Sequence, residues 1–389
     1  MPLILFMRFL FSLLSLVLLA ATAYLLWTWY QGDSFIDVYH VRHLVRHDWR
    51  LWTGIAGLVW SFGGGGLLIK PFLAKPDKAP SRSAHPAGEI IPGANGAMLY
   101  VEQEGAPDEP VIILTHGWGL DSTIWSVAKR DLAKTFRVVS WDLPGMGKSK
   151  APNAAVSLSS FAENLALVIR HTGAERVVLV GHSIGGMSVQ TLARDNSGLF
   201  NDRVAGVVLV NTSYHNPLKT MAFRGLAQAL RFPILEPQLF ITMLLWPIAW
   251  LSAWKSYLDG SAHVANRFGF GAYVTRSQLE QTTLLTIRNS QRAQAKGNLA
   301  MFRWDADRAL ADKNTPVLVI AGSWDIVTKP SASIHIAGTI PGAELIIVDK
   351  VNHMGFLERA DLYNPAIARF ASDAFQKCHT LRGPTAGAA

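Results

Sequence analysis

The sequence has only one cysteine, Cys378, among its 389 residues. One cysteine excludes an internal disulfide and any C-x-x-C pair, and the twelve histidines contain no H-E-x-x-H spacing. Because no motif supports metal binding, we expect neither a metal nor a cofactor. The chain also lacks internal repeats and low-complexity tracts apart from Gly63–Gly66, and no interleaved aromatic and basic motif predicts a nucleic-acid partner.

Long runs without charge occupy the first part of the chain. Phe9–Tyr30 contains 22 residues without a charge, is rich in leucine and ends in an aromatic cluster. At 1.5 Å per residue such a helix is about 33 Å long, which is enough for a hydrocarbon core of about 30 Å. Leu51–Ile69 is a second uncharged run of 19 residues, and its six glycines are tolerated in membrane helices. The sequence therefore predicts a membrane anchor within residues 1–70, formed by one or two transmembrane helices.

Two questions about this anchor stay open: whether the first run is instead a cleaved signal peptide, and on which side of the membrane the rest of the chain lies. Arg8 precedes the first run and Ala21–Ala23 resembles a cleavage site, which is typical of a signal peptide, although the run is longer than the usual apolar region. If both runs span, five basic residues flank the pair against three between them, which favours a cytoplasmic location for the rest of the chain. If only the first run spans, the same preference of basic residues for the cytoplasmic side permits the rest of the chain to lie outside the cytoplasm. The lone cysteine is compatible with either compartment.

Charge supports a lipid partner. The net charge is +8, and residues 1–88 hold 8 basic and 4 acidic side chains, so half of the excess lies beside the apolar runs. Basic flanks of an apolar helix more often meet anionic lipid than nucleic acid. The sequence says nothing about the oligomeric state.

The remaining chain alternates apolar strands with helical stretches. Residues 71–88 contain four prolines and are expected to be a linker, followed by a hairpin around Ala94–Gly96 and strands near residues 111, 136, 177, 205, 317 and 344. This order predicts an α/β domain at 89–376 with a mostly parallel sheet covered by helices on both faces. The long interval at about 211–314 predicts a helical cap inserted after the strand Val204–Val210, and residues 377–389 are expected to be a C-terminal tail.

The apolar run Arg176–Val180 leads directly into Gly181-His182-Ser183-Ile184-Gly185. A G-x-S-x-G sequence on a strand-to-helix turn holds a strained, exposed serine nucleophile, and its glycines let a strand and a helix pass closely. The pentapeptide alone is weak evidence in a chain with 32 glycines. Its context therefore decides whether Ser183 is catalytic.

Two later strands deliver suitable partners for this serine. Pro316–Gly322 runs into Asp325, and Glu344–Val348 runs into His353. An imidazole is needed to accept the seryl proton, and a carboxylate is needed to fix its tautomer and stabilise its cation. Each residue alone could be an ordinary helix cap or core histidine, but the order serine, acid, histidine at strand ends favours catalysis. Asp349 and Glu358 are the alternative acids, since both lie near His353 in sequence.

A fourth segment is expected to bind an anion. The strand Pro110–Thr115 is followed by His116-Gly117-Trp118-Gly119. A loop at this place supplies one backbone N–H to an oxyanion, and the residue after the serine supplies the second. These donors would be the amides of Trp118 and Ile184, so their side chains carry no catalytic requirement, and His116 is expected to be structural.

At this point the chain resembles the α/β-hydrolase superfamily, in particular its lipase, esterase and cofactor-free perhydrolase-like members. The resemblance implies Ser183 as nucleophile, His353 as base and Asp325 as orienting acid, and it excludes branches with an aspartate nucleophile such as epoxide hydrolases and haloalkane dehalogenases. It covers about residues 89 to 376 and rests on five segments in order: His116–Gly119, Asp142–Ser149, Gly181–Gly186, Gly322–Asp325 and Asn352–His353.

One competing motif fails on a single residue. Gly145–Ser149 looks like the end of a phosphate-binding G-x-x-x-x-G-K-[ST] loop, but the first glycine of that motif would be Asp142. A carboxylate there would repel a nucleotide. We instead expect Asp142 to be a polar anchor at the end of its strand.

We therefore expect a membrane-anchored serine hydrolase acting on small-molecule or lipid esters. A perhydrolase or thioesterase would use the same residues, and a catalytically idle scaffold that binds a ligand or partner is the alternative outside enzymes. Every expected catalytic group lies at or after residue 116, so residues 1–88 are expected to anchor without catalysing. Within the cap, Trp246, Trp250 and Trp254 share one side of a helix and are either packed in the core or rest in the lipid interface.

Overall fold

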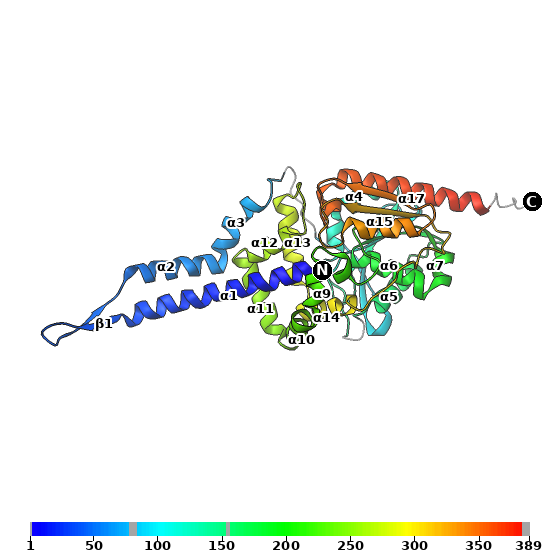
Figure 1. Cartoon of the computed structure of the whole chain (residues 1–389). Coiled ribbons are helices and arrows are strands. Elements are labelled where there is room, and N and C mark those ends of the chain that lie inside the picture. The colour runs from blue at the N-terminus through cyan, green and yellow to red at the C-terminus, as the bar shows by residue number, and fades with distance from the viewer. Residues whose placement is uncertain (1, 78–83, 153–155, 383–389) are drawn as a thin grey trace, which may run out of the picture.

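The structure is a computed structural model that describes residues 2–77, 84–152 and 156–382. Its centre is an eight-stranded sheet with the order β10-β9-β8-β7-β5-β6-β4-β3, in which β5 to β10 run parallel and β3 and β4 are antiparallel (Figure 1). The strands are β3 (Glu89–Pro92), β4 (Met98–Glu104), β5 (Val111–Thr115), β6 (Arg137–Trp141), β7 (Val177–His182), β8 (Val204–Val210), β9 (Val317–Gly322) and β10 (Glu344–Val348).

The central strands are apolar along their whole length because helices cover both faces. Every residue of β5, β7, β8 and β9 is buried, which explains their continuous valine, isoleucine and leucine content. One face packs against α4 (Ser126–Leu132) and α17 (Ala360–Arg382). The other packs against α5 (Leu158–His171), α6 (Ile184–Asp195) and α15 (Pro330–Thr339). The predicted parallel sheet, hairpin and strand positions are confirmed.

A group of helices lies between β8 and β9, where the cap was predicted. Some cap residues form two small apolar clusters of their own, and others belong to the two large apolar clusters that include the strands of the sheet. Its elements are α8 (Pro217–Thr220), α9 (Arg224–Ala229), η5 (Arg231–Leu235), α10 (Glu236–Leu244), α11 (Trp246–Leu258), α12 (Ser261–Arg267), α13 (Arg276–Arg288) and α14 (Gln291–Met301).

The N-terminal residues form a helical hairpin that projects away from the sheet (Figure 1). Its elements are α1 (Pro2–Gln31), the antiparallel strands β1 (Asp33–Ile36) and β2 (Arg42–Val45), α2 (Asp48–Val59), η1 (Trp60–Gly64) and α3 (Gly65–Leu73). Leu10–Gln31 and Asp48–Leu73 are each long and apolar enough to cross a membrane. The second is kinked at η1, where Gly63 has a φ of 144° that favours glycine.

Small residues let the two arms of this hairpin approach closely. A Cβ atom on Gly54 would lie 2.5 Å from the Leu26 side chain, and one on Gly57 would lie 2.2 Å from Thr22 Oγ1. Such contacts are typical of helices that associate inside a membrane. The N-terminal part of α1 is different, because it packs against α11 and α12 of the cap.

Part of the predicted linker contacts the cap, and the last helix extends into the predicted tail. Lys75 forms backbone hydrogen bonds with Val274 and Arg276 of the cap. The Asp77 carboxylate accepts a hydrogen bond from the Ser277 amide at 3.0 Å. Helix α17 continues to Arg382, past the expected tail boundary. Residues 78–83 of the linker and 383–389 of the tail lie outside the described residues.

Candidate active site

Ser183 occupies a strained turn between β7 and α6. Its φ of 54° and ψ of −116° lie in a region that residues with a side chain rarely adopt. The turn requires close backbone approach, since a Cβ on Gly181 would lie 2.5 Å from the Gly185 carbonyl carbon, and one on Gly185 would lie 2.3 Å from the Thr115 oxygen. These glycines explain why the turn has the G-x-S-x-G sequence.

Asp325 and His353 meet at the carboxyl ends of β9 and β10. The Nδ1 atom of His353 lies 3.0 Å from Oδ2 of Asp325, and both side chains are buried. The carboxylate also accepts hydrogen bonds from the amides of Val327 and Thr328 at 2.8 Å and from the Asn211 side chain at 2.9 Å. Burial opposes its negative charge, but the His353 imidazole and these donors outweigh burial and lower the pKa of Asp325. The carboxylate is therefore ionised and fixed in orientation.

The second nitrogen of His353 is available for proton transfer. Because Nδ1 donates its proton to Asp325, Nε2 is the basic atom of the neutral ring. Nε2 is buried and makes no hydrogen bond within residues 2–77, 84–152 and 156–382. Such an arrangement is suited to a general base.

The alternative acids are occupied elsewhere. Glu358 accepts hydrogen bonds from the amides of Gly271 and Tyr273 at 2.6 and 2.9 Å, so it braces a cap segment. Asp349 is exposed and contacts Ser323. Neither takes the place of Asp325 beside His353.

His182, which the sequence did not single out, connects the serine turn to the histidine loop. Its Nε2 donates a hydrogen bond to the backbone oxygen of His353 at 3.1 Å. The ring is enclosed by aromatic side chains, with the Phe356 ring centroid 4.6 Å away, and a Cβ on Gly117 would lie 2.4 Å from its Nδ1 atom. Complete burial and the neighbouring imidazole lower the pKa of His182 well below its ordinary value, so it stays neutral.

The expected anion-binding amides lie on two segments that meet near Ser183. Ile184 is the first residue of α6, whose N-terminus has amides without helical acceptors. Trp118 lies on the loop after β5, where Gly119 has a φ of 78°. Both side chains are buried, so they line the interior as expected.

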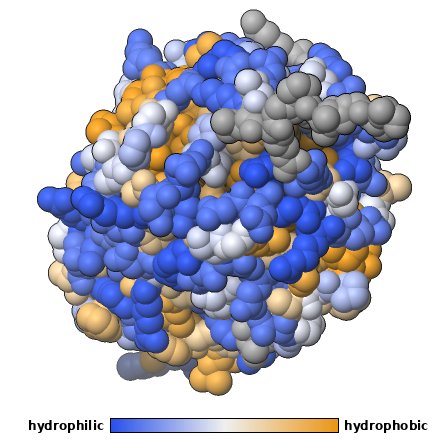
Figure 2. All heavy atoms as spheres, turned by 90° about the vertical axis from the view of Figure 1, so that its right-hand side faces the viewer, coloured by the Kyte–Doolittle hydropathy of each residue, from blue (hydrophilic) through white to orange (hydrophobic). Residues whose placement is uncertain are grey.

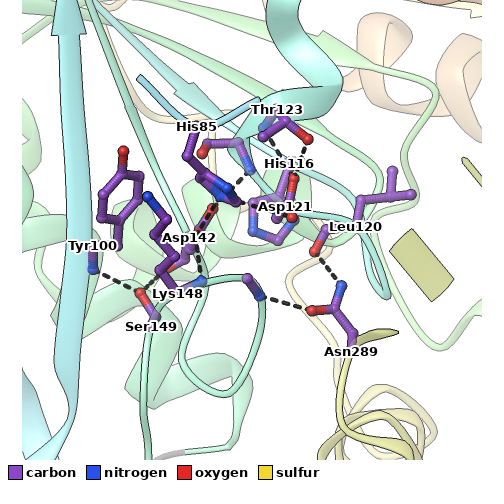
Figure 3. A network of polar contacts seen from close by, with 12 residues as sticks. His85, Tyr100, His116, Leu120, Asp121, Thr123, Asp142, Lys148, Ser149 and Asn289 are labelled. Atoms are coloured by element: carbon purple, nitrogen blue, oxygen red, sulfur yellow. Dashed lines mark hydrogen bonds and ion pairs between the residues drawn. The ribbon is translucent and has the colours of Figure 1, made fainter. Parts of the chain in front are cut away.

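The cap holds this anion-binding loop in place. The Asn289 amide group at the end of α13 donates hydrogen bonds to the oxygens of Gly119 and Leu120 at 2.9 and 3.0 Å, as Figure 3 shows for Leu120. The Trp118 indole N–H donates a hydrogen bond to the backbone oxygen of Gln294 at 3.0 Å. The indole ring occupies the space that a side chain on Gly297 would need. Three contacts from α13 and α14 thus fix one side of the candidate anion site.

Asp142 is the polar anchor that the sequence predicts. Its carboxylate accepts hydrogen bonds from the amides of Ser122 at 2.7 Å and Lys148 at 2.8 Å, and His85 donates to it at 3.2 Å (Figure 3). Burial disfavours the charge, but these hydrogen-bond donors outweigh burial and lower the pKa of Asp142. His85, Asp142 and Asp121 could hold a cation by spacing alone. Because the amides and His85 already satisfy the Asp142 oxygens, we assign this cluster a structural role.

His116 is structural, as expected. Its Nε2 accepts the Leu143 amide proton at 2.9 Å, so Nδ1 carries the ring proton and donates to the Gly117 oxygen at 2.8 Å. Burial lowers its pKa and keeps the ring neutral. It joins the loops that follow β5 and β6.

A mostly parallel sheet with a strained serine after β7 and a buried acid–imidazole pair after β9 and β10 defines an α/β hydrolase. Residues 110–360 match the family described as the alpha/beta hydrolase fold, and the chain belongs to this family.

Known relatives and structures agree with this class. The chain is 28% identical over 238 residues to the bifunctional esterase/perhydrolase DCH of Acinetobacter calcoaceticus, covering 60% of this chain and 80% of that protein. An esterase from Exiguobacterium antarcticum has the same fold with a TM-score of 0.61 at 18% identity, covering 74% of this chain and all of that chain. The enol-lactonase from Burkholderia xenovorans LB400 matches with a TM-score of 0.58 at 22% identity, covering 73% and 100%. The chain is therefore a hydrolase with esterase-like relatives.

Proposed function

We propose that this protein is a serine hydrolase that cleaves carboxylic esters at a membrane. The observation that carries the proposal is the strained Ser183 turn beside the buried Asp325–His353 pair, with an imidazole Nε2 that has no protein partner in the described part of the chain. Strain of this kind persists where function requires it. The sequence order serine, acid, histidine agrees with the fold.

The reaction follows from the roles of these groups. The hydroxyl oxygen of Ser183 attacks the acyl carbon while Nε2 of His353 takes its proton. Asp325 stabilises the resulting imidazolium, which then protonates the departing alcohol as the acyl–oxygen bond breaks. A water molecule gives its proton to the same nitrogen and attacks the acyl-enzyme, which releases the carboxylic acid and restores the serine.

The amides of Trp118 and Ile184 supply the electrostatic part of catalysis. Charge develops on the carbonyl oxygen during both steps, and two preorganised N–H donors stabilise it. Loss of one such donor typically costs about 3 kcal/mol. Because these are backbone groups, the Asn289 and Gln294 contacts that position the loop would control them.

The N-terminal hairpin supports membrane anchoring. Two helices there pass the length and apolarity requirement for a span, and large apolar side chains remain exposed along both. An exposed surface of that kind is costly in water. An anchored enzyme would meet apolar or lipid-like esters at high local concentration.

Hydrolysis of a graded series of p-nitrophenyl esters by the purified full-length protein tests this function. We expect turnover that rises with acyl chain length before solubility limits it, and turnover at least about 10³-fold lower in a Ser183→Ala variant of equal melting temperature. Absence of hydrolysis across the whole series by folded protein would favour the idle-scaffold alternative.

One relative favours perhydrolysis as the second candidate activity. The esterase/perhydrolase DCH resembles this chain over 238 residues. In perhydrolysis, hydrogen peroxide instead of water attacks the acyl-enzyme and releases a peracid. Peroxide-dependent oxidation of a halide in the presence of acetate, lost in Ser183→Ala, would establish this activity; ester turnover without it would leave hydrolysis alone.

A further inference from the structure

The cap helix α11 is joined to the N-terminal helix α1 by a buried polar contact. The Lys255 ammonium donates hydrogen bonds to the Ser15 backbone oxygen at 2.9 Å and to Asp259 at 2.8 Å, and the Ser15 hydroxyl contacts both charged groups. One turn earlier, the hydroxyls of Ser12 and Ser252 form a hydrogen bond. Lys255, Asp259 and Ser15 are all buried. We call the group Ser15, Lys255 and Asp259 the α1–α11 lock.

The position of this lock along α1 determines how deep the lock would lie in a bilayer. The candidate span is Leu10–Gln31, and only residues 16–31 follow Ser15. Those 16 residues extend about 24 Å, which is less than the hydrocarbon thickness of about 30 Å, and tilting the helix increases the shortfall. If α1 crosses the bilayer, the turn that carries Ser12 and Ser15 must lie inside the hydrocarbon. The part of α11 in contact with it then lies at the same depth.

The surfaces of α10 and α11 suit that depth. The segments Arg231–Leu244 and Trp246–Leu258 meet at an angle of 103°, and together they are long and apolar enough for a broken span or a re-entrant loop. Between Pro237 and Trp254 the sequence has no charge. Large apolar side chains on this pair are exposed: Phe240, Ile241, Leu244, Leu245, Trp246, Ile248, Trp250 and Leu251.

The charges at the ends of this stretch are neutralised in pairs. Arg231 contacts Glu236 at 2.7 Å, and Lys255 contacts Asp259 at 2.8 Å. These four are the charged residues between positions 231 and 259. Charged groups at membrane depth are tolerated when they pair and face protein, as these do.

The face opposite the hairpin has a different character. The end of the molecule opposite the hairpin is covered mainly by hydrophilic residues with scattered apolar ones (Figure 2). Among the described residues, most of the exposed large apolar side chains lie within residues 10–72 and 223–258, which contain the hairpin, α10 and α11. Continuity with the candidate spans identifies the lipid bilayer as the occupant of this apolar surface.

We infer that α10 and α11 are immersed in the leaflet that contains the first turns of α1, with the α1–α11 lock holding them there, and that this placement suits an apolar ester substrate in the same leaflet. The inference rests on the proposed membrane anchoring and ester hydrolysis. Helix α10 packs on α14 through Leu239 and Ala295, and α14 contacts Trp118 of the candidate anion site. One layer of protein thus separates the lipid-facing helix from the site.

Only two of the three tryptophans on α11 are exposed enough for contact with lipid. Trp246 and Trp250 are 49% and 47% exposed, as an interfacial role requires. Trp254 is only partly exposed and packs against Tyr257 with ring centroids 5.8 Å apart. The third tryptophan therefore belongs to the cap core, because α11 turns that side towards α12.

Depth-dependent fluorescence quenching tests the inference with the full-length protein. In a Cys378→Ser background, the variants Ile241→Cys and Ile248→Cys are each labelled with an environment-sensitive fluorophore. The labelled proteins are reconstituted into phosphatidylcholine vesicles that contain lipids spin-labelled high on the acyl chain. Val17→Cys on the exposed side of α1 is the immersed reference, and Asn201→Cys on α7 is the reference outside the membrane. We expect the two cap positions to be quenched at least about half as strongly as position 17.

Each outcome has one meaning. Cap positions that behave like position 201 while position 17 is quenched overturn the inference and leave anchoring intact. Loss of quenching at position 17 overturns anchoring, on which the inference depends. Disulfide-linked dimers formed when the unlabelled Ile241→Cys or Ile248→Cys protein is oxidised with copper phenanthroline, together with no quenching of the labelled protein, would show that a second copy covers this face, which also overturns the inference. The Ser183→Ala variant should give the same quenching, so a failure of ester hydrolysis is measured separately.

Discussion

The two ends of the molecule bury charge for different purposes. Around the sheet, buried Asp142 and Asp325 receive several N–H donors that hold loops and an imidazole in place, and the face opposite the hairpin is mainly hydrophilic (Figure 2). At the hairpin and on α10 and α11, the outer surface is apolar and Lys255 pairs with Asp259 inside. In the proposed function, buried ionic groups position the reaction at one end and allow membrane contact at the other.

The largest expected effect concerns the catalytic end. Ser183→Ala and His353→Ala should each lower kcat by at least about 10³-fold with little change in melting temperature, because the members of such a triad act as a unit. Asp325→Asn should be nearly as severe. Retention of more than about a tenth of the wild-type turnover in folded Ser183→Ala would show that another group is the nucleophile.

The membrane end should respond most strongly when one charge of the lock is removed alone. Lys255→Met leaves Asp259 buried without its partner, which typically costs about 3–5 kcal/mol, whereas replacing both residues by apolar ones is often close to neutral. We expect a large fall in the melting temperature of the single variant in detergent and recovery in Lys255→Met/Asp259→Leu. Arg369→Met breaks an exposed pair of the same spacing with Asp373 and should change little. Equal effects of Lys255→Met and Arg369→Met would refute a buried lock.

This contact changes the expectation for truncation. Because residues 1–88 supply Ser15 to the lock and His85 to Asp142, their removal should leave the chemistry of Ser183 but lower the stability of the cap. The sequence alone predicts a truncated domain with the full rate.

A smaller effect is expected where the cap meets the anion-binding loop. Asn289→Ala removes the donors to Gly119 and Leu120 and should lower kcat about 10-fold with KM nearly unchanged, since a loosened anion site affects the transition state more than substrate binding. Asn201→Ala on the exposed surface of α7 is the control. A rise in KM at constant kcat would assign Asn289 to substrate binding instead.

The smallest effect concerns pH. Burial disfavours the imidazolium of His85, but its hydrogen bond and charge interaction with Asp142 outweigh burial and raise the pKa of His85. A raised pKa means that the stabilisation is present below the ordinary value of about 6.5 and is lost as pH rises through the folded value. The melting-temperature difference between wild type and His85→Gln should therefore be larger near about pH 5 than near about pH 8. His171→Gln, which breaks a surface contact with Glu89, is the control, and a pH-independent difference would contradict this role.

Local patterns explain what the sequence predicts correctly. Continuous apolar runs identify the strands, and Ser183, Asp325 and His353 each follow such a run, so their placement at one edge of a parallel sheet follows from topology. Asp142 and His116 are predictable for the same reason.

The residues that the sequence does not reveal act across long separations. Asn289 contacts Gly119 across 170 positions, His182 contacts His353 across 171, and Ser15 contacts Asp259 across 244. No spacing rule connects such pairs, and an asparagine at a helix end or a serine in an apolar helix has ordinary local explanations. The cap arrangement that brings them together depends on packing among short helices.

Covalent labelling tests the central claim most directly. The full-length protein in membranes is treated with a fluorophosphonate, digested with trypsin and sequenced by mass spectrometry. The account predicts a phosphonyl adduct on Ser183 within the peptide Val177–Arg194, absent when His353 is replaced by alanine. No adduct on folded protein, or an adduct on Ser188 of the same peptide, would contradict the assignment of Ser183 as the nucleophile.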